Sequence, residues 1–113
     1  MAASISVVES GTITSPQGFT AGATYAGLKT FAEDKLDLGI ILSEVPCISA
    51  GVFTTSTIKS PTVTVNQAHL KQAKPKGIIV NAGIANACVG EQGHKDAEEM
   101  ASIAGEILGA NAN

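Results

Sequence analysis

The stretch from residue 77 to residue 108 constrains the fold more than any other part of this chain, because it joins a strand, a loop and a helix in succession. Residues 77–81 (GIIVN) form a short apolar run rich in β-branched side chains, which is the strongest strand signal in the sequence. A loop rich in Gly and Asn follows over residues 82–93. Apolar positions then recur at spacings of three and four over residues 94–108, which predicts a helix with one buried face.

The helix predicted for residues 94–108 has two different faces. Its buried face should consist of Ala97, Met100, Ala101, Ala104, Ile107 and Leu108. Its solvent face should carry Glu98, Glu99 and Glu106. Gly109 is suited to end the helix, because glycine enters the left-handed conformation without steric cost.

Four further strands are predicted before this stretch. They are residues 5–8, 36–42, 50–55 and 62–65, which are β-branched, aromatic or alternating runs. Asn66 can cap a short helix over residues 67–72, while residues 11–19 are predicted to form a loop and residues 74–77 a turn. This order of elements predicts an α/β fold: a layered sheet-and-helix domain in which a helix covers one face of a sheet.

Composition limits the classes of protein to consider. The 113 residues suffice for one domain, and 44% are hydrophobic, enough for a core made mainly of Val, Ile, Leu and Ala. Only 15% are charged, which favours burial of part of the surface against a partner. The net charge is −3, with acidic residues and lysines scattered along the chain, so a basic nucleic-acid interface is not expected.

The two cysteines and the hydropathy pattern bear on the compartment. Cys47 and Cys88 are far apart in apolar contexts, so they are predicted to be buried free thiols in a reducing compartment. No apolar run approaches the ~18 residues that span a bilayer, and the N-terminus lacks the pattern of a secretory signal. A cytoplasmic protein without membrane contact is therefore expected.

The loop over residues 82–93 is the candidate functional segment, because loops after strands often position ligands in α/β proteins. Gly83, Gly90 and Gly93 permit positive φ or close backbone approach. The side-chain amides of Asn81 and Asn86 can hold the loop in shape by bonding to its backbone.

Sharper interpretations of this loop fit less well. A phosphate-binding loop would need a Gly-Lys-Ser or Gly-Lys-Thr ending, and the glycine spacing does not match a dinucleotide fingerprint. Cys88 and His94 could form a nucleophile and its base. A core cysteine and a surface histidine are the more common explanation of such positions. Only two histidines occur, without clustered ligands, so no metal site is predicted.

Residues 77–93 (GIIVNAGIANACVGEQG) closely resemble the strand-loop segment of the ornithine acetyltransferase family, whose usual form is VNSGNANACTG followed by a further Gly. The residues retained are Asn81, Gly83, Asn86, Ala87 and Gly90. The departures are Ala82 for Ser, Ile84 for Asn and Val89 for Thr, and each removes a polar group.

Other stretches resemble the same family in the same order. They are TSPQGF (14–19), ATYAGLK (23–29), PCISAGVFTT (46–55), PTV (61–63) and the helical residues 95–109. The resemblance runs from about residue 11 to residue 109. It implies the ornithine acetyltransferase (DmpA/ArgJ-like) fold, with residues 1–113 as the N-terminal portion of a single α-chain domain, incomplete at its C-terminal end.

The resemblance also implies an activity. Members of this family are N-terminal-nucleophile acyltransferases of arginine biosynthesis, or glutamate N-acetyltransferases, made as a precursor that cuts itself before a Thr. That Thr begins the β chain, accepts acetyl from N-acetylornithine as an acyl-enzyme and passes it to glutamate. The implied partners are the β chain and the remainder of the α chain, in an α2β2 assembly. No cofactor is implied, although acetyl-CoA is a candidate acetyl donor in bifunctional members.

None of the family's catalytic or substrate-binding residues can be placed within residues 1–113, so the chain alone is expected to be inactive. In the family, the oxyanion donors belong to a strand beyond the last helix, and the nucleophile lies farther on. Asn81, Gly83, Asn86 and Gly90 are expected to support the site without touching substrate.

Two alternatives to this enzyme stay open. One is a non-catalytic fragment or scaffold chain of the same fold. The other is acyl transfer to a different amino-acid substrate. The three polar groups lost from the loop point slightly toward loss of chemistry or specialisation, while the standard family reaction stays the first expectation.

Overall fold

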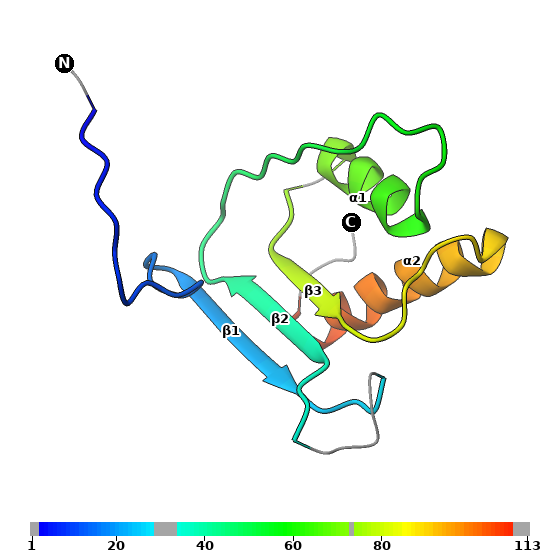
Figure 1. Cartoon of the computed structure of the whole chain (residues 1–113), viewed down its shortest axis with the longest axis horizontal. Helices are drawn as coiled ribbons and strands as arrows, with labels where there is room; N and C mark the ends of the chain where they lie inside the picture. The colour runs from blue at the N-terminus through cyan, green and yellow to red at the C-terminus, as the bar shows by residue number, and fades with distance from the viewer. Residues whose placement is uncertain (1–2, 29–33, 73, 110–113) are drawn as a thin grey trace.

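The computed structural model describes residues 3–28, 34–72 and 74–109. The elements in chain order are β1 (Phe19–Thr24), β2 (Leu38–Ser43), α1 (Pro61–Gln72), β3 (Gly77–Asn81) and α2 (Gly90–Ile107). Figure 1 shows the three strands side by side, with α2 next to β3 and α1 packed on α2. The predicted sheet-and-helix arrangement is therefore confirmed.

The sheet has the strand order β1-β2-β3, and both neighbouring pairs are antiparallel. The strand predicted at 36–42 is β2, shifted by two residues at its start and one at its end, and it stops before Pro46 as expected. The strand predicted at 77–81 is β3, residue for residue. In the central register Ile40 lies opposite Ile79, so these two side chains share a face of the sheet.

Strand β1 was not predicted, because its sequence FTAGAT is rich in Ala and Gly, which have low strand propensity. All six of its residues are exposed, so burial does not hold it in place either. It is a strand because it pairs with β2 along its whole length, from Phe19 opposite Ser43 to Thr24 opposite Leu38. Gly18, with a φ of 86°, turns the chain into this strand.

Helix α2 contacts β3 on one side and α1 on another, so it links α1 to the sheet. It begins at Gly90, four residues before the predicted start, because the chain turns into the helix at that glycine (φ 64°). Gly93 and Ala97 are buried on it, and the glutamates predicted to face solvent are exposed. The predicted burial of Ile107 is wrong: this side chain is 79% exposed at the last turn.

The predicted end of α2 is confirmed. The N–H of Leu108 donates to the carbonyl of Ala104 at 3.0 Å, and the N–H of Gly109 donates to the carbonyl of Glu106 at 3.2 Å. Gly109 has a φ of 63°, the left-handed conformation that glycine tolerates.

Helix α1 replaces the strand predicted at 62–65 and takes in the short helix predicted at 67–72. Pro61 is its first residue, a position that proline favours, and the carbonyl of Ser60 accepts the N–H of Val63 at 3.0 Å. Asn66 lies inside the helix and does not cap it. The β-branched run misled the prediction because Pro61 and Val65, four residues apart, are both buried on one side of the helix.

The strands predicted at 5–8 and 50–55 are also wrong, since neither segment has regular secondary structure. Neither segment pairs with a strand of the sheet, which has the order β1-β2-β3 in the described part of the chain. Residues 3–10 extend away from the body, and the connection that contains 50–55 runs over α1 (Figure 1). Val52 on that connection is completely exposed.

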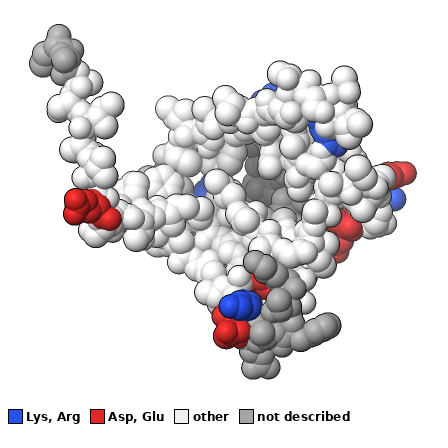
Figure 2. Space-filling view, in the orientation of Figure 1, with Lys and Arg blue, Asp and Glu red and all other residues white. Residues whose placement is uncertain are grey.

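The core is smaller than the composition predicted. Within the described ranges, the buried apolar side chains are Pro61, Val65 and Ala97, while many large ones are exposed. The radius of gyration is 16.1 Å, against about 13 Å expected for a compact domain of this length. Figure 2 shows that the visible face is mostly uncharged. No helix in the described part of the chain has the length and hydropathy needed to cross a membrane.

The placement of β3 can be tested with a matched pair of substitutions. Ile79 is half-buried, whereas its neighbour Ile78 is 59% exposed on the other face. Ile79→Asp should lower the free energy of unfolding by about 2 kcal/mol or more, because a carboxylate loses water at that position. Ile78→Asp should cost less than about 1 kcal/mol. Urea unfolding followed by circular dichroism measures both, and equal losses would contradict the placement.

Candidate functional site

The signature loop is the connection of residues 82–89 between β3 and α2. A backbone hydrogen bond fixes its first residue: the N–H of Ala82 donates to the carbonyl of Asp37 at 2.8 Å. The loop therefore starts beside the residue that leads into β2. This bond places the loop at the end of the sheet where β1 ends and β2 begins (Figure 1).

Asn81 and Gly83 shape the first turn of the loop. The Nδ2 of Asn81 donates to the carbonyl of Ile84 at 3.2 Å, which holds the turn closed. Gly83 has a φ of 101°, a conformation that residues with a Cβ rarely adopt. The predicted architectural roles of the Asn81 amide and of this glycine are what the local geometry shows.

Asn86 joins the loop to α2. Its Nδ2 donates to the carbonyl of Gly93 at 2.7 Å, and the contact is partly buried. Its Oδ1 is buried and has no hydrogen-bond partner within the described residues. A buried hydrogen bond from a side-chain amide contributes about 1 kcal/mol to stability, and losing one of its partners costs about 1–3 kcal/mol.

Gly93 is the residue that lets this contact form, through the close approach that the sequence analysis expected of the glycines in this segment. A Cβ at this position would collide with the Oδ1 of Asn86 and lie 2.9 Å from the Cγ of Pro61. The loop, the start of α1 and the first turn of α2 thus meet at one glycine.

Two residues at the junction of the loop and α2 have left-handed backbone conformations. Cys88 has a φ of 57° and Gly90 a φ of 64°. A Cβ on Gly90 would meet open space, so its conformation and not crowding favours glycine there. At Cys88, a residue with a Cβ adopts that conformation at some steric cost.

The predicted environments of the cysteines and of His94 need correction. Cys88 is exposed, because it belongs to the turn before α2 and not to a core, and His94 is half-buried on the first turns of that helix. Cys47 is half-buried, and its Sγ–H donates to the carbonyl of Pro75 at 3.3 Å. No hydrogen bond connects Cys88 to His94 among the described side chains, so nothing marks them as nucleophile and base.

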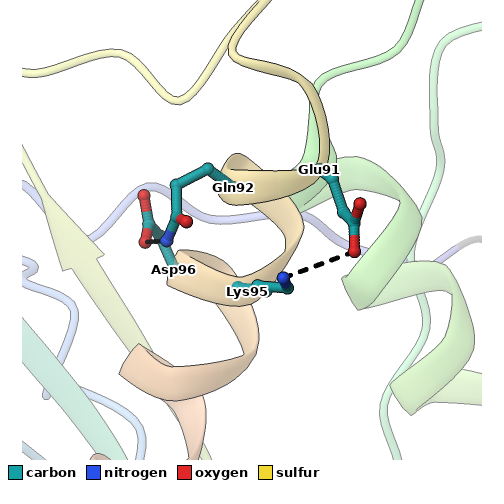
Figure 3. A network of polar contacts seen from close by, with 4 residues as sticks. All are labelled: Glu91, Gln92, Lys95 and Asp96. Atoms are coloured by element: carbon teal, nitrogen blue, oxygen red, sulfur yellow. Dashed lines mark hydrogen bonds and ion pairs between the residues drawn. The ribbon is translucent and has the colours of Figure 1, made fainter.

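Helix α2 starts without a side-chain cap, since its N-cap residue is Val89. Two side-chain contacts along its first two turns support this start (Figure 3). Lys95 pairs with Glu91 at 3.4 Å, and the Nε2 of Gln92 donates to Asp96 at 2.7 Å. Each such pair contributes about 0.2–0.5 kcal/mol, and the negative Glu91 also suits the positive end of the helix dipole.

Asp37 is a buried polar residue that the sequence interpretation missed. It is only 3% exposed, and its carboxylate accepts the N–H groups of Ala26 and Leu28, each at 2.6 Å. Its own N–H donates to the carbonyl of Thr24 at 3.1 Å. A lone acid inside the apolar run Leu36-Asp37-Leu38 was the signal that could have identified it.

The site therefore contains groups that position the chain. Amides, glycines and one buried carboxylate organise two loops at one end of the sheet. No cluster of three or more metal-binding side chains occurs among the residues that the structure describes.

Comparison with known proteins assigns this arrangement to a family. The model of the ArgJ family matches residues 20–113, which is most of the chain. The chain belongs to the ArgJ family. It is 44% identical over 108 residues to the arginine biosynthesis bifunctional protein ArgJ of Dehalococcoides mccartyi, an alignment that covers 96% of this chain and 27% of that protein. It is 46% identical over 99 residues to the ArgJ of Staphylococcus epidermidis, covering 87% and 24%.

Solved ArgJ-family structures have the same fold. The arginine biosynthesis bifunctional protein ArgJ of Bacillus halodurans matches with a TM-score of 0.85 at 36% identity, over 93% of this chain and 54% of that chain. The ornithine acetyltransferase of Mycobacterium tuberculosis, solved with ornithine, matches with a TM-score of 0.81 at 34% identity, over 88% and 54%. The chain spans about a quarter of the curated relatives and about half of the solved chains.

Gly93→Ala tests the contact between the loop and the helices. The added methyl group should lower the free energy of unfolding by about 1–3 kcal/mol, because Asn86 and Pro61 must move to admit it. Gly22→Ala on β1 is the matched control, since a Cβ there meets open space, and it should change stability by less than about 0.5 kcal/mol. Chemical denaturation of both variants measures the difference, and a tolerated alanine at 93 would refute the close approach.

The two thiols should differ in reactivity. Cys88 is exposed, whereas Cys47 is half-buried and hydrogen-bonded, so a thiol reagent should label Cys88 first in the folded protein. Mass spectrometry of peptides after brief labelling reads both sites in one sample. Labelling in denaturant, where the two rates should become similar, is the control. Faster labelling of Cys47 would contradict the described environments.

Proposed function

We propose that the protein built with this chain is a glutamate N-acetyltransferase of the ornithine acetyltransferase type, which moves acetyl from N-acetylornithine to glutamate in arginine biosynthesis. The observation that carries this proposal is the fold match to an ornithine acetyltransferase solved with ornithine, at 34% identity over 88% of the chain. The chain also keeps the signature residues Asn81, Gly83, Asn86 and Gly90 in an ordered loop.

The proposed chemistry proceeds through an acyl-enzyme on a Thr at the start of a β chain. The Thr hydroxyl oxygen attacks the acetyl carbonyl carbon, the amide C–N bond breaks, and ornithine leaves with a proton on its amine. The free α-amine of the same Thr acts as the base. The amine of glutamate then attacks the ester, which forms N-acetylglutamate and restores the hydroxyl. Hydrogen-bond donors stabilise the oxyanion in both halves.

The lengths of the relatives support a divided protein. The chain covers 27% of a curated relative but 54% of a solved chain, so that solved chain is about half as long as that relative. This difference is expected if the precursor is cut into two chains of similar size. We propose that residues 1–113 are the N-terminal part of the α chain, and that its remainder and a β chain complete an α2β2 assembly in the cytoplasm.

The role proposed for this chain is support of the acetyl-transfer site. The geometry for this role is the contact from Asn86 to Gly93 and the bond from Ala82 to Asp37, which fix both ends of the loop. Neither contact involves a group that could attack a carbonyl. The chain alone is therefore proposed to be inactive, with no bound cofactor required for the reaction.

One observation favours a second candidate, acyl transfer to a different amino-acid substrate. Ala82, Ile84 and Val89 stand where the family usually has polar residues, and all three are exposed in the structure. Exposed apolar side chains on this loop suit contact with a less polar acceptor or with a further segment of the protein.

The test uses the assembled protein, with acetylornithine and glutamate as substrates. Formation of N-acetylglutamate, dependent on a second polypeptide that begins with Thr, is expected, and the 113-residue chain by itself should show no turnover. Acetyl-CoA in place of acetylornithine tests the second donor, and other amino acids in place of glutamate test the alternative acceptor. Turnover by the isolated chain, confirmed pure by mass spectrometry, would overturn the proposal.

Asn86→Ala extends this test to the loop. It should lower kcat/KM of the assembled enzyme about tenfold, because losing the buried hydrogen bond of the side-chain amide costs about 1–3 kcal/mol. Gly22→Ala, which lies away from the loop on β1, is the control and should leave the rate unchanged. Full activity and stability in Asn86→Ala would show that the loop contact does not support the site.

A further inference from the structure

A groove of about 530 Å³ lies between α1 and the connection that follows β2. Figure 1 shows this connection running over α1, and residues from both segments line the groove. The side chains that matter in it are Ser49, Phe53, Lys59, Gln67, Leu70 and Lys71. None of them belongs to the signature loop, and the acetyl-transfer proposal gives the groove no role.

The apolar part of the groove is made by Phe53 and Leu70, both half-buried. Gly51 lets the connection cross α1 closely, since a Cβ there would lie 2.9 Å from the Cδ1 of Leu70 and 3.1 Å from the ring of Phe53. The connection can therefore lie close to α1 because residue 51 has no side chain. This close packing keeps the two apolar side chains together.

The helix side of the groove presents three residues on one face. Gln67, Leu70 and Lys71 occupy positions i, i+3 and i+4 of α1, which bring their side chains together. Gln67 is half-buried, and neither it nor Ser49 makes a side-chain hydrogen bond in the described part of the chain. Two neutral polar groups are therefore available beside the apolar side chains.

The charge of the groove is positive. Lys59 comes from the connection and Lys71 from the last turn of α1, and no ion pair holds either of them among the described residues. The lysines are scattered as the sequence indicated, but the acidic residues are not. Residues 45–90 contain four Lys and no Asp or Glu, although the whole chain has a net charge of −3. No acidic side chain of that long stretch offsets the two ammonium groups.

We propose that this groove binds a small organic anion, with a carboxylate or phosphate group held by Lys59 and Lys71 and an apolar body against Phe53 and Leu70. The two ammonium groups supply the attraction, and Gln67 and Ser49 supply neutral hydrogen bonds. The volume falls in the range of small-molecule sites, about 300–1,000 Å³. The inference does not depend on whether the protein transfers acetyl groups.

The probes separate the two head groups and the apolar contribution. Phenyl phosphate and phenylacetate each carry one anionic group on a ring, and inorganic phosphate lacks the ring. Isothermal titration calorimetry of the assembled protein at low salt should show one site per chain for at least one ring-bearing anion, with a Kd of about 1 mM or tighter. Inorganic phosphate should bind more weakly, and added salt should weaken all three.

Matched substitutions assign the binding to this groove. The double variant Lys59→Gln with Lys71→Gln should weaken binding about tenfold or more. Each exposed charge contact contributes modestly, so both lysines are replaced together to give a measurable loss. Lys74→Gln removes a charge from the same acid-free stretch without lining the groove, so binding should stay within about twofold of the unaltered protein. Ala50→Trp should block the groove while both lysines remain. Unchanged thermal midpoints confirm that the variants are folded.

Three results would overturn the inference. The first is the absence of saturable binding of either ring-bearing anion below about 10 mM. The second is a loss of affinity in Lys74→Gln equal to that in the double variant. The third is protection of Lys59 and Lys71, relative to Lys74, from acylation in the assembled protein without added anion, because a polypeptide segment would then occupy the groove.

Discussion

Strand β2 organises the described structure, because it is hydrogen-bonded to β1 on one side and to β3 on the other. Asp37, directly before β2, continues this role beyond the sheet. Its carboxylate holds the turn after β1, and its carbonyl holds the start of the signature loop. A single buried residue thus couples two loops at one end of the sheet, so displacement of β2 would disturb both loops together.

The second constraint is an excess of apolar surface. Three buried apolar side chains and a three-stranded sheet exposed along β1 do not make a core of ordinary size. The low fraction of charged residues has its explanation here, since these surfaces suit contact with further polypeptide. The proposed assembly with the rest of an α chain and a β chain would supply that contact, and it places the chemistry outside this chain.

What this chain contributes to the proposed acetyl-transfer site is the backbone geometry of its signature loop. The signature loop combines left-handed turns at Gly83 and Gly90 with the contact from Asn86 to Gly93, and none of these groups attacks a substrate. Preorganised backbone of this kind is what an acyl-transfer site needs from its surroundings, because misplacement by ~1 Å can cost about 10²-fold in rate. The groove beside α1 is lined by other residues, which include two lysines and the apolar side chains of Phe53 and Leu70.

The sequence by itself determined β3, most of β2, the part of α2 from residue 94 onward, the end of that helix at Gly109 and the family resemblance. Each depends on local pattern or on residues close in sequence. Only the tertiary structure decided that FTAGAT is a strand, that PTVTV begins a helix, that Cys88 is exposed and that Asp37 is buried. These outcomes depend on partners distant in the chain: β2 supplies the hydrogen bonds of β1, the packing of α1 on α2 overrides β-branched propensity, and backbone N–H groups from another loop satisfy a buried carboxylate.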